Sequence, residues 1–298
     1  MLDAVIVGGS SAGLSAALIL GRSLREVVVV DDQKPCNRFS RASHGFLTRD
    51  GMPPADLLHL AHEQLTHYPS VVLKAATVLR IERTDLGFEI ISSDASKLEA
   101  RSVLLATGLK DEMPPLAGIQ ALWGKSVFHC PYCDGYELRG KAIAVYGVDE
   151  EALHQVMLLR NLTDTLTLCA GEGWRITPAQ RERLTRHGIQ IIEQPIEALE
   201  YVDTQLEAIR FADGTRLICD ALFIRPRTTH RTSFARDLGC KVDDQDIVQV
   251  DPRGRTSVKG IYAAGDLSSN MRSVALAVAQ GAAAAYGINA DLIAQDFS

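Results

Sequence analysis

Two cysteines stand close together in the middle of the chain and are followed at once by an acidic residue. The segment reads CPYCDG over residues 130–135. Thiols separated by two residues can close a reversible disulfide, and such spacing can lower a thiol pKa to about 7 or below, so a reactive thiolate is available near neutral pH. An adjacent carboxylate could move the proton during the exchange. The segment therefore indicates thiol–disulfide redox chemistry, with Cys130, Cys133 and Asp134 as the candidate catalytic residues.

Two alternatives exist for this cysteine pair. Half of a zinc site has the same spacing, and two neighbouring cysteines can also be buried without a function. Zinc needs two further ligands, and His129 would be a cramped one beside Cys130. The four other cysteines are single and scattered, at Cys36, Cys169, Cys219 and Cys240. Redox work is therefore favoured, and no metal is expected.

Length, composition and charge limit the remaining possibilities. The chain has 298 residues, of which 46% are hydrophobic, so two domains with separate cores are expected. A formal net charge of -6 without any Lys/Arg run argues against nucleic acid or an anionic membrane as a partner. No secretory signal is visible in residues 1–7, and the longest low-charge stretch, residues 273–289, is slightly too short to span a bilayer. We expect a cytoplasmic protein without a transmembrane segment, with reduced thiols and one catalytic pair.

The N-terminal region has the pattern of a dinucleotide-binding unit. A β-branched run at residues 4–7 meets the turn GGSSAG at residues 8–13, and residues 14–20 have helical composition. A second apolar run, at residues 27–30, ends in Asp31, 18 residues after Gly13. Glycines allow a pyrophosphate to approach the helix N-terminus, and the acid can bind a ribose. Ser10 replaces the middle glycine of the usual motif, so an ordinary α/β turn remains an alternative for this segment.

The pattern of strand, turn and helix occurs twice. Residues 103–108 and 260–266 are buried strands that end in small residues, whereas residues 141–147, 151–159 and 165–169 form a second strand, helix and strand. The sequence therefore predicts an α/β protein with two Rossmann-like three-layer domains, the second inserted in the first. We expect the domains to comprise residues 1–112 with 245–298, and residues 113–244. The crossings are expected near Pro114-Pro115 and in residues 225–227.

Taken together, these motifs resemble the low-molecular-weight thioredoxin reductases over essentially the whole chain. The further markers are Ala106-Thr107-Gly108, residues 256–258 (TSV) and residues 263–266 (AAGD). The resemblance implies that the discontinuous domain binds FAD and that the inserted NAD(P)-binding-like domain carries the disulfide. It also implies that Cys133 faces the flavin, that Cys130 exchanges with substrate and that Asp134 is the acid/base. The implied cofactor-binding residues are Gly8, Ser10, Ser11, Ala12, Gly13, Asp31, His44, Val78, Ala106, Thr107, Gly108, Gly265, Asp266, Arg272, Ser273 and Val274.

The loop that begins at His44 differs from that of ordinary thioredoxin reductases. Residues 44–51 read HGFLTRDG and stand where the family's loop passes near the flavin. This wording is closer to the atypical reductases and the dithiol oxidases. Those oxidases usually carry His directly after the second cysteine, but this chain carries Asp134, which keeps the reductase interpretation open. A structural role for His44 is the alternative to a flavin contact.

The second nucleotide site departs from the family pattern. Residues 147–152 read GVDEEA in place of G-x-G-x-x-A, which puts Asp149, Glu150 and Glu151 where a pyrophosphate should approach the helix. A carboxylate ~5 Å from a phosphate costs roughly 3 kcal/mol at an effective dielectric of about 20, or ~100-fold in affinity. Residues 170–173 read AGEG where NADPH-dependent members carry a basic cluster. We therefore expect NADPH to bind poorly.

The sequence thus predicts an FAD-dependent thiol–disulfide oxidoreductase that does not use NADPH. Ferredoxin, a dithiol, or a second FAD in the vacated site are alternative electron partners. The substrate would be a thioredoxin-like protein or a small dithiol or disulfide, and the resemblance implies a homodimer. An ordinary NADPH-dependent thioredoxin reductase and a flavin-bound redox sensor without turnover remain the alternatives.

Overall fold

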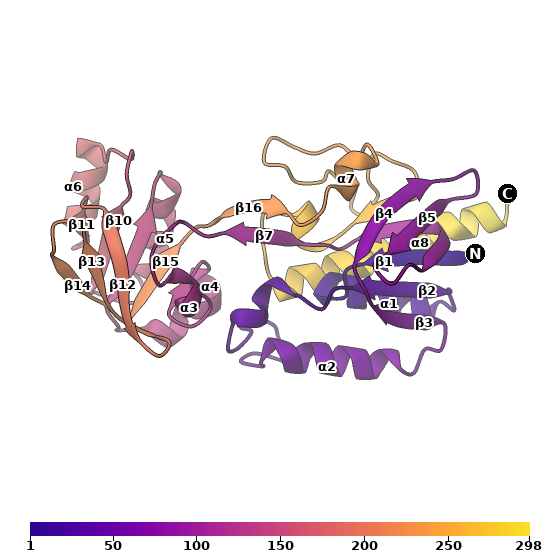
Figure 1. Cartoon of the computed structure of the whole chain (residues 1–298), viewed down its shortest axis with the longest axis horizontal. Helices are drawn as coiled ribbons and strands as arrows, with labels where there is room; N and C mark the ends of the chain where they lie inside the picture. Colours follow the sequence, from indigo (N-terminus) through magenta and orange to yellow (C-terminus); the bar gives the residue numbers. More distant parts are fainter. The chain divides into compact units, whose positions relative to one another are not determined.

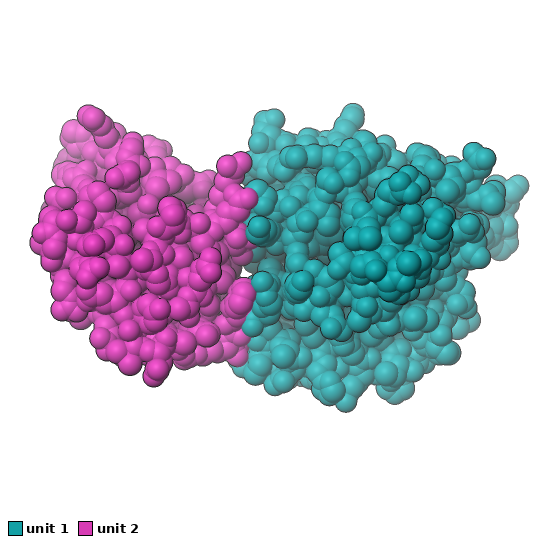
Figure 2. Space-filling model, in the orientation of Figure 1, with its two compact units in different colours: residues 1–38, 46–110, 228–298 teal, residues 39–45, 111–227 magenta.

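The computed structural model describes all residues, 1–298, and its chain forms two compact units (Figure 2). Unit 1 comprises Met1–Arg38, Phe46–Lys110 and Thr228–Ser298. Unit 2 comprises Phe39–Gly45 and Asp111–Arg227. Unit 2 is therefore mostly one continuous segment inserted into unit 1, with a short second piece contributed from near the N-terminus.

A mixed sheet of seven strands forms the centre of unit 1 (Figure 1). The order is β3-β2-β1-β6-β5-β4, and β17 pairs with the end of β6. The strands β1, β2, β3, β6 and β17 run parallel, whereas β4 and β5 form an antiparallel extension. The strands are β1 (Leu2–Val7), β2 (Val27–Asp31), β3 (Val71–Ala75), β4 (Val78–Arg83), β5 (Phe88–Ser92), β6 (Lys97–Leu105) and β17 (Ile261–Ala263).

Both faces of this sheet are buried, which explains the unbroken apolar runs of its central strands. In β1, Val5 and Val7 belong to the core on one face, and Ala4 and Ile6 to the core on the other. The second face is covered by α1 and α8, which pack against each other. The helices of unit 1 are α1 (Ser11–Arg22), α2 (Pro54–Leu65), α7 (Phe234–Asp237) and α8 (Val274–Asp296). None of the helices combines the length and the apolar composition that a membrane crossing requires.

Unit 2 combines a parallel sheet with a small antiparallel one. The parallel sheet has the order β11-β10-β9-β15-β8, and the antiparallel sheet the order β12-β13-β14. The strands are β8 (Val127–Phe128), β9 (Ile143–Gly147), β10 (Leu166–Ala170), β11 (Gln190–Ile192), β12 (Ile196–Val202), β13 (Gln205–Phe211), β14 (Arg216–Ile218) and β15 (Ala221–Ile224). The helices are α3 (Ile119–Leu122), α4 (Pro131–Asp134), α5 (Glu151–Leu159) and α6 (Pro178–Arg186).

The chain crosses between the units through two paired strands, β7 (Leu109–Glu112) and β16 (Arg227–His230). The first crossing lies close to the expected position. The second lies at 227/228, directly after residues 225–227 where a crossing was expected, so unit 1 begins again before residue 245, the boundary expected for the domain. Residues 228–244 belong to unit 1 because Phe234, Ala235 and Cys240 are buried in its core. The segment 39–45, which the sequence assigned to the first domain, belongs to unit 2.

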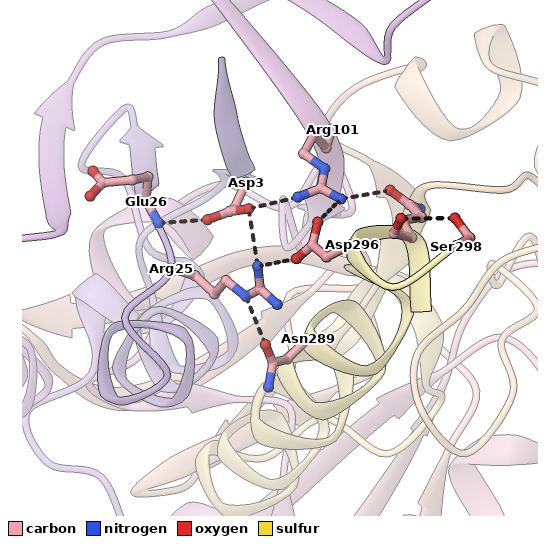
Figure 3. A network of polar contacts seen from close by, with 8 residues as sticks. Asp3, Arg25, Glu26, Arg101, Asn289, Asp296 and Ser298 are labelled. Carbon is pink, nitrogen blue, oxygen red and sulfur yellow. Dashed lines mark hydrogen bonds and ion pairs between the residues drawn. The ribbon is translucent and has the colours of Figure 1, made fainter. Parts of the chain in front are cut away.

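A network of hydrogen bonds and ion pairs connects the C-terminal end of α8 with the rest of unit 1 (Figure 3). Asp3 contacts both Arg25 and Arg101, at 3.4 Å and 3.3 Å. Asp296 contacts the same two arginines, at 3.0 Å and 2.6 Å. Arg25 also donates to the side chain of Asn289 at 2.8 Å. The last turns of α8 are thus held to β1, β6 and the loop before β2.

Candidate active site

A disulfide joins Cys130 and Cys133, whose Cα atoms are 5.3 Å apart. Cys130 lies at the N-cap of the short helix α4, and Pro131 occupies the first turn, where its missing N–H is no loss. The backbone N–H groups of Cys133 and Asp134 both donate to the Cys130 carbonyl at 3.1 Å. This turn brings the two sulfurs together, so the pair that the sequence singled out is formed in the structure.

Two residues around α4 fix the position of the disulfide. Gly135 is required because a Cβ there would lie 2.4 Å from the carbonyl oxygen of Pro131 and 2.7 Å from Leu162. Gln155, buried on α5, donates its Nε2–H to the carbonyl of His129 at 2.7 Å. This hydrogen bond holds the residue directly before Cys130. Gln155 could not be singled out from the sequence, because nothing distinguishes it there from other polar residues of a helix.

Asp134 follows the disulfide and is largely removed from water. Burial raises the pKa of its carboxyl from 3.8 to about 6, with smaller opposing effects from His44, which lowers the pKa, and Glu137, which raises it. A carboxyl that titrates near pH 6 can both donate and accept a proton near neutrality. Asp134 is thus suited to the acid/base work predicted for it.

His44 lies in unit 2 with Asp134, because the segment around it packs there. A Cβ on Gly124 would lie 2.8 Å from the backbone of Phe39, and Arg41 donates to the hydroxyl of Thr204 at 2.9 Å. The His44 Nε2 is 3.7 Å from the Glu137 Oε1, and the two side chains are 21% and 47% exposed. A flavin contact was predicted for His44, with a structural role as the alternative, but its position near Glu137 and Asp134 was not predicted.

The glycine-rich turn of unit 1 has the close contacts that a dinucleotide-binding turn needs. A Cβ on Gly8 would lie 2.3 Å from the Ala106 carbonyl oxygen, and one on Gly13 would lie 1.9 Å from the Gly8 carbonyl oxygen. The Gly9 N–H donates to the Asp31 Oδ1 at 2.9 Å, so the acid at the end of β2 is fixed beside the turn. The turn and Asp31 therefore come together as the sequence predicted.

Two observations test whether this site fits FAD. Ser10 is the N-cap of α1, and Ser11 and Ala12 begin its first turn. The Ser10 side chain forms no capping hydrogen bond, so the first N–H groups of the helix can bind an anion. The Thr107 Oγ1, in the segment between Ala106 and Gly108 after β6, is buried without a hydrogen-bond partner in the protein. An orphaned hydroxyl and an open helix N-terminus at the ends of adjacent strands fit a pyrophosphate-bearing cofactor.

The C-terminal candidates also cluster in unit 1. Gly265 has a φ of 78°, and its N–H donates to the Gln280 side chain at 2.9 Å. Asp266 pairs with Arg272 at 3.1 Å, with both side chains 15% exposed. Ser273 caps α8 by accepting from the Leu276 N–H at 3.1 Å, and Val274 begins the helix. Val78, at the start of β4, is buried in the core of unit 1.

Gly281 is a further residue of unit 1 that the sequence analysis missed. A Cβ there would lie 2.0 Å from the Ala12 carbonyl oxygen. Gly281 therefore lets α8 approach the start of α1 closely. Gly281 does not stand out in the sequence, because it lies among the many small residues of an Ala-rich helix.

The acidic turn of unit 2 lies at the end of β9, before α5. The Glu151 N–H donates to the Asp149 Oδ1 at 3.0 Å, so a carboxylate of the protein already binds the start of this helix. Glu150 instead accepts from the Gln180 side chain at 2.8 Å, and Glu151 pairs with Arg225 at 2.8 Å. Of the three acids, one therefore occupies the position that a pyrophosphate would need.

The remaining cysteines form no disulfides. Cys36 is exposed, with its Sγ 4.0 Å from the Asp266 Oδ2, whereas Cys169, Cys219 and Cys240 are buried. Burial raises the pKa of each of these three thiols. Buried thiols with raised pKa values are poor nucleophiles, so these three cysteines are not candidates for thiol exchange.

Comparisons with known proteins agree with this geometry. Residues 2–281 match the family model described as pyridine nucleotide-disulphide oxidoreductase. The thioredoxin reductase aclD of Aspergillus oryzae is 30% identical, over 98% of this chain and 96% of the relative. A Bacillus anthracis structure assigned as thioredoxin reductase TrxB has a TM-score of 0.95 and 33% identity, covering 99% of this chain and 100% of the other. An oxidoreductase structure from Agrobacterium tumefaciens has a TM-score of 0.92 and 32% identity, covering 98% of each chain.

These matches extend over both units and include the segments that carry the disulfide and the glycine-rich turn. The chain therefore belongs to the pyridine nucleotide-disulphide oxidoreductases, as a thioredoxin reductase-like flavoprotein disulfide oxidoreductase.

Proposed function

We propose that this protein transfers electrons between an FAD in unit 1 and the Cys130–Cys133 disulfide of unit 2, and that NADPH is not its electron donor. The observation that carries the second statement is the hydrogen bond from the Glu151 N–H to the Asp149 carboxylate. This contact fills the helix N-terminus where a nucleotide pyrophosphate would bind.

The residues of unit 1 would hold FAD as follows. The N–H groups at the start of α1 would bind the pyrophosphate, Asp31 would bind the adenosine ribose and Asp266 the ribityl chain. The Thr107 hydroxyl would gain a hydrogen-bond partner. The bound flavin would supply two-electron redox chemistry. Gly8 and Gly13 would keep the turn closed tightly against the start of α1 and the segment after β6, since neither position has room for a Cβ.

The residues of unit 2 would carry the thiol chemistry. Cys130 would exchange with the substrate and Cys133 would face the flavin. Asp134 would take up or release the proton, because its pKa of about 6 allows both forms near neutral pH. Gln155 and Gly135 would keep the pair in place during repeated opening and closing of the disulfide.

The structure allows a better estimate of the free energy by which the acidic turn opposes NADPH binding. Asp149 alone is directed at the helix N-terminus, since Glu150 and Glu151 are engaged by Gln180 and Arg225. Asp149 is exposed, so water weakens its repulsion of a phosphate. One carboxylate about 4–5 Å from a phosphate then costs roughly 1–3 kcal/mol, which corresponds to about 10- to 100-fold in affinity.

The loop after β10 adds to this penalty. It carries Glu172 and no cationic side chain within residues 170–173, so this loop has no basic fork for a 2′-phosphate. The decisive experiment is anaerobic stopped-flow mixing of the purified protein with millimolar NADPH or NADH. We expect slow flavin bleaching without saturation. Fast bleaching with a micromolar half-saturation would reject the proposal.

An ordinary NADPH-dependent thioredoxin reductase is the second candidate. One structural feature favours it: Arg225, at the end of β15, is 61% exposed and could leave Glu151 to bind a phosphate. Relatives named thioredoxin reductases point the same way. The stopped-flow experiment separates the two candidates directly.

The partners follow from the same comparisons. A thioredoxin-like protein is the expected substrate because the relatives are named for it, and a small dithiol or disulfide is the alternative. Ferredoxin, or a second FAD in the unit 2 site, would replace NADPH as electron partner. We further propose a cytoplasmic homodimer. Purified protein mixed in turn with reduced ferredoxin and with dithiols would identify the donor, and sedimentation would give the oligomeric state.

A further inference from the structure

Three ionisable side chains gather beside the disulfide, although they come from distant parts of the sequence. Asp134 follows Cys133, Glu137 lies in the next turn, and His44 comes from the segment 39–45. The Asp134 carboxyl is largely buried, whereas the Glu137 side chain is 47% exposed. His44, with 21% exposure, lies 3.7 Å from Glu137 and close enough to Asp134 for its charge to act on that carboxyl.

We propose that His44 and Glu137 carry protons between solvent and Asp134, and so set how fast the disulfide can open and close. This inference rests on the proposed function of Cys130 and Cys133. Asp134 lies in the same turn as the two reacting sulfurs. His44 and Glu137 act on the sulfurs only through Asp134. The two are therefore positioning residues for a proton and not catalytic residues themselves.

The chemistry requires such a path. Opening the disulfide breaks one S–S bond, adds two electrons and forms two thiolates, and full reduction adds two protons to form two thiols. Electrons come from the flavin or from a dithiol substrate, which is oxidised to its disulfide and releases two protons. A buried carboxyl can supply one proton at once but must be reprotonated before the next cycle. An imidazole can accept and donate protons near neutral pH, and so can return a proton to the carboxylate.

The other groups around α4 do not offer an alternative. The turn of residues 136–138 and α5 pack against α4. On α5, the residue that contacts the segment before α4 is the neutral Gln155. The exposed ionisable residues of α5 are His154 and Glu151, and Glu151 pairs with Arg225. The charges that act on Asp134 are those of His44 and Glu137. His44 and Glu137 are therefore the side chains through which we expect the proton to reach Asp134.

The experiment compares His44→Gln and Glu137→Gln in the full-length, flavin-loaded protein. Dithiothreitol is the reductant, and the rate of disulfide reduction is measured from pH 5 to 8 and corrected for the dithiothreitol thiolate. We expect the rate at pH 7 to fall about tenfold in each variant, which is less than the roughly 10²–10⁴-fold effect of a direct general acid or base because both residues act through Asp134. Imidazole in the buffer should restore the His44→Gln rate.

The titration of Asp134 is a second readout, which needs neither flavin nor turnover. Infrared difference spectra against Asp134→Asn should place the wild-type pKa near 6. The pKa should rise in His44→Gln and fall in Glu137→Gln, because the two neighbours act on it in opposite directions. His59→Gln is the matched control, since His59 forms a similar pair with Glu63 at 3.3 Å in unit 1. It should leave both readouts unchanged.

The outcomes separate this inference from the proposed function. Unchanged rates and pH profiles in both variants, or no rescue by imidazole, would overturn the proton path. If both Cys130→Ser and Cys133→Ser kept the wild-type rate of two-electron reduction by dithiothreitol, the proposed function itself would fail. Should His44→Gln lose its flavin, Glu137→Gln and the infrared titration still decide the question.

Discussion

Asp134→Asn should make unit 2 more stable at neutral pH while it slows thiol–disulfide exchange. The pKa of Asp134 rises from 3.8 to about 6, chiefly through burial. Each tenfold change in proton affinity corresponds to about 1.4 kcal/mol, so the ionised carboxyl costs up to about 3 kcal/mol of folding stability. The side chain keeps partial contact with water, which reduces the expected gain to about 2 kcal/mol. Loss of the proton donor should slow exchange by about 100-fold.

The sign of the pH dependence follows from proton binding. Between pH 3.8 and about 6 the folded state binds the Asp134 proton while the unfolded state has lost it. Stability therefore falls as the pH rises through this window and is constant above it. The stability difference between Asp134→Asn and wild type should be small at pH 4, grow up to pH 6 and then level off.

Urea denaturation followed by tryptophan fluorescence can measure this difference. Both tryptophans of the chain, Trp123 and Trp174, lie in unit 2, so their emission reports that unit. Asp213→Asn is the contrasting control, because Thr215 donates hydrogen bonds that lower the pKa of Asp213. It should destabilise unit 2 instead. If Asp134→Asn were no more stable at pH 7.5, or if its effect were independent of pH, the carboxyl would be solvated and the acid/base assignment would lose its basis.

Three further predictions concern the cofactor, the thiols and the nucleotide. Gly13→Val should purify without flavin, because even a Cβ would lie 1.9 Å from the Gly8 carbonyl oxygen; a full flavin complement in the absorption spectrum would contradict the placement. Cys130→Ser should show a long-wavelength absorption band from the Cys133 thiolate beside oxidised flavin, and Cys133→Ser should not; the reverse pattern would exchange the two roles. Asp149→Asn should bind NADH about tenfold more tightly by fluorescence titration, since one repulsive charge is removed, and an unchanged affinity would refute the electrostatic argument.

Much of the fold could be predicted because local patterns agree with the tertiary structure. The sequence predicted a helix over residues 151–159, and α5 spans Glu151–Leu159. The predicted strand at 165–169 is β10, at Leu166–Ala170. The two Rossmann-like units and their α/β class are confirmed by the sheet order and the structural relatives. Buried parallel strands give continuous apolar runs, which are a strong signal.

The errors arose where distant contacts decide the structure. The chain returns to unit 1 at 227/228, beside the crossing expected in residues 225–227, but the sequence does not show that residues 228–244 already belong to unit 1, because that depends on the packing of Phe234 into its core. The low-charge stretch at residues 273–289 lies almost entirely in α8, which continues to Asp296, where Arg25 and Arg101 bind the last turn. The candidate site shows the same division. Cys130, Cys133 and Asp134 are neighbours in the sequence, whereas the position of His44 beside Glu137 depends on how residues 39–45 pack.

The crossing strands β7 and β16 pair with each other, so the inserted segment of unit 2 begins and ends at adjacent positions and can be regarded as a cassette. A segment whose two ends are adjacent can be inserted into another domain without disrupting that domain's fold. A cassette cut at these strands would carry Asp111–Arg227, with Cys130, Cys133 and Asp134, but would leave Phe39–Gly45 behind. A graft of this kind would import the thiols and their acid without His44. Exchange of such modules would therefore preserve the redox pair while altering the rate at which it is supplied with protons.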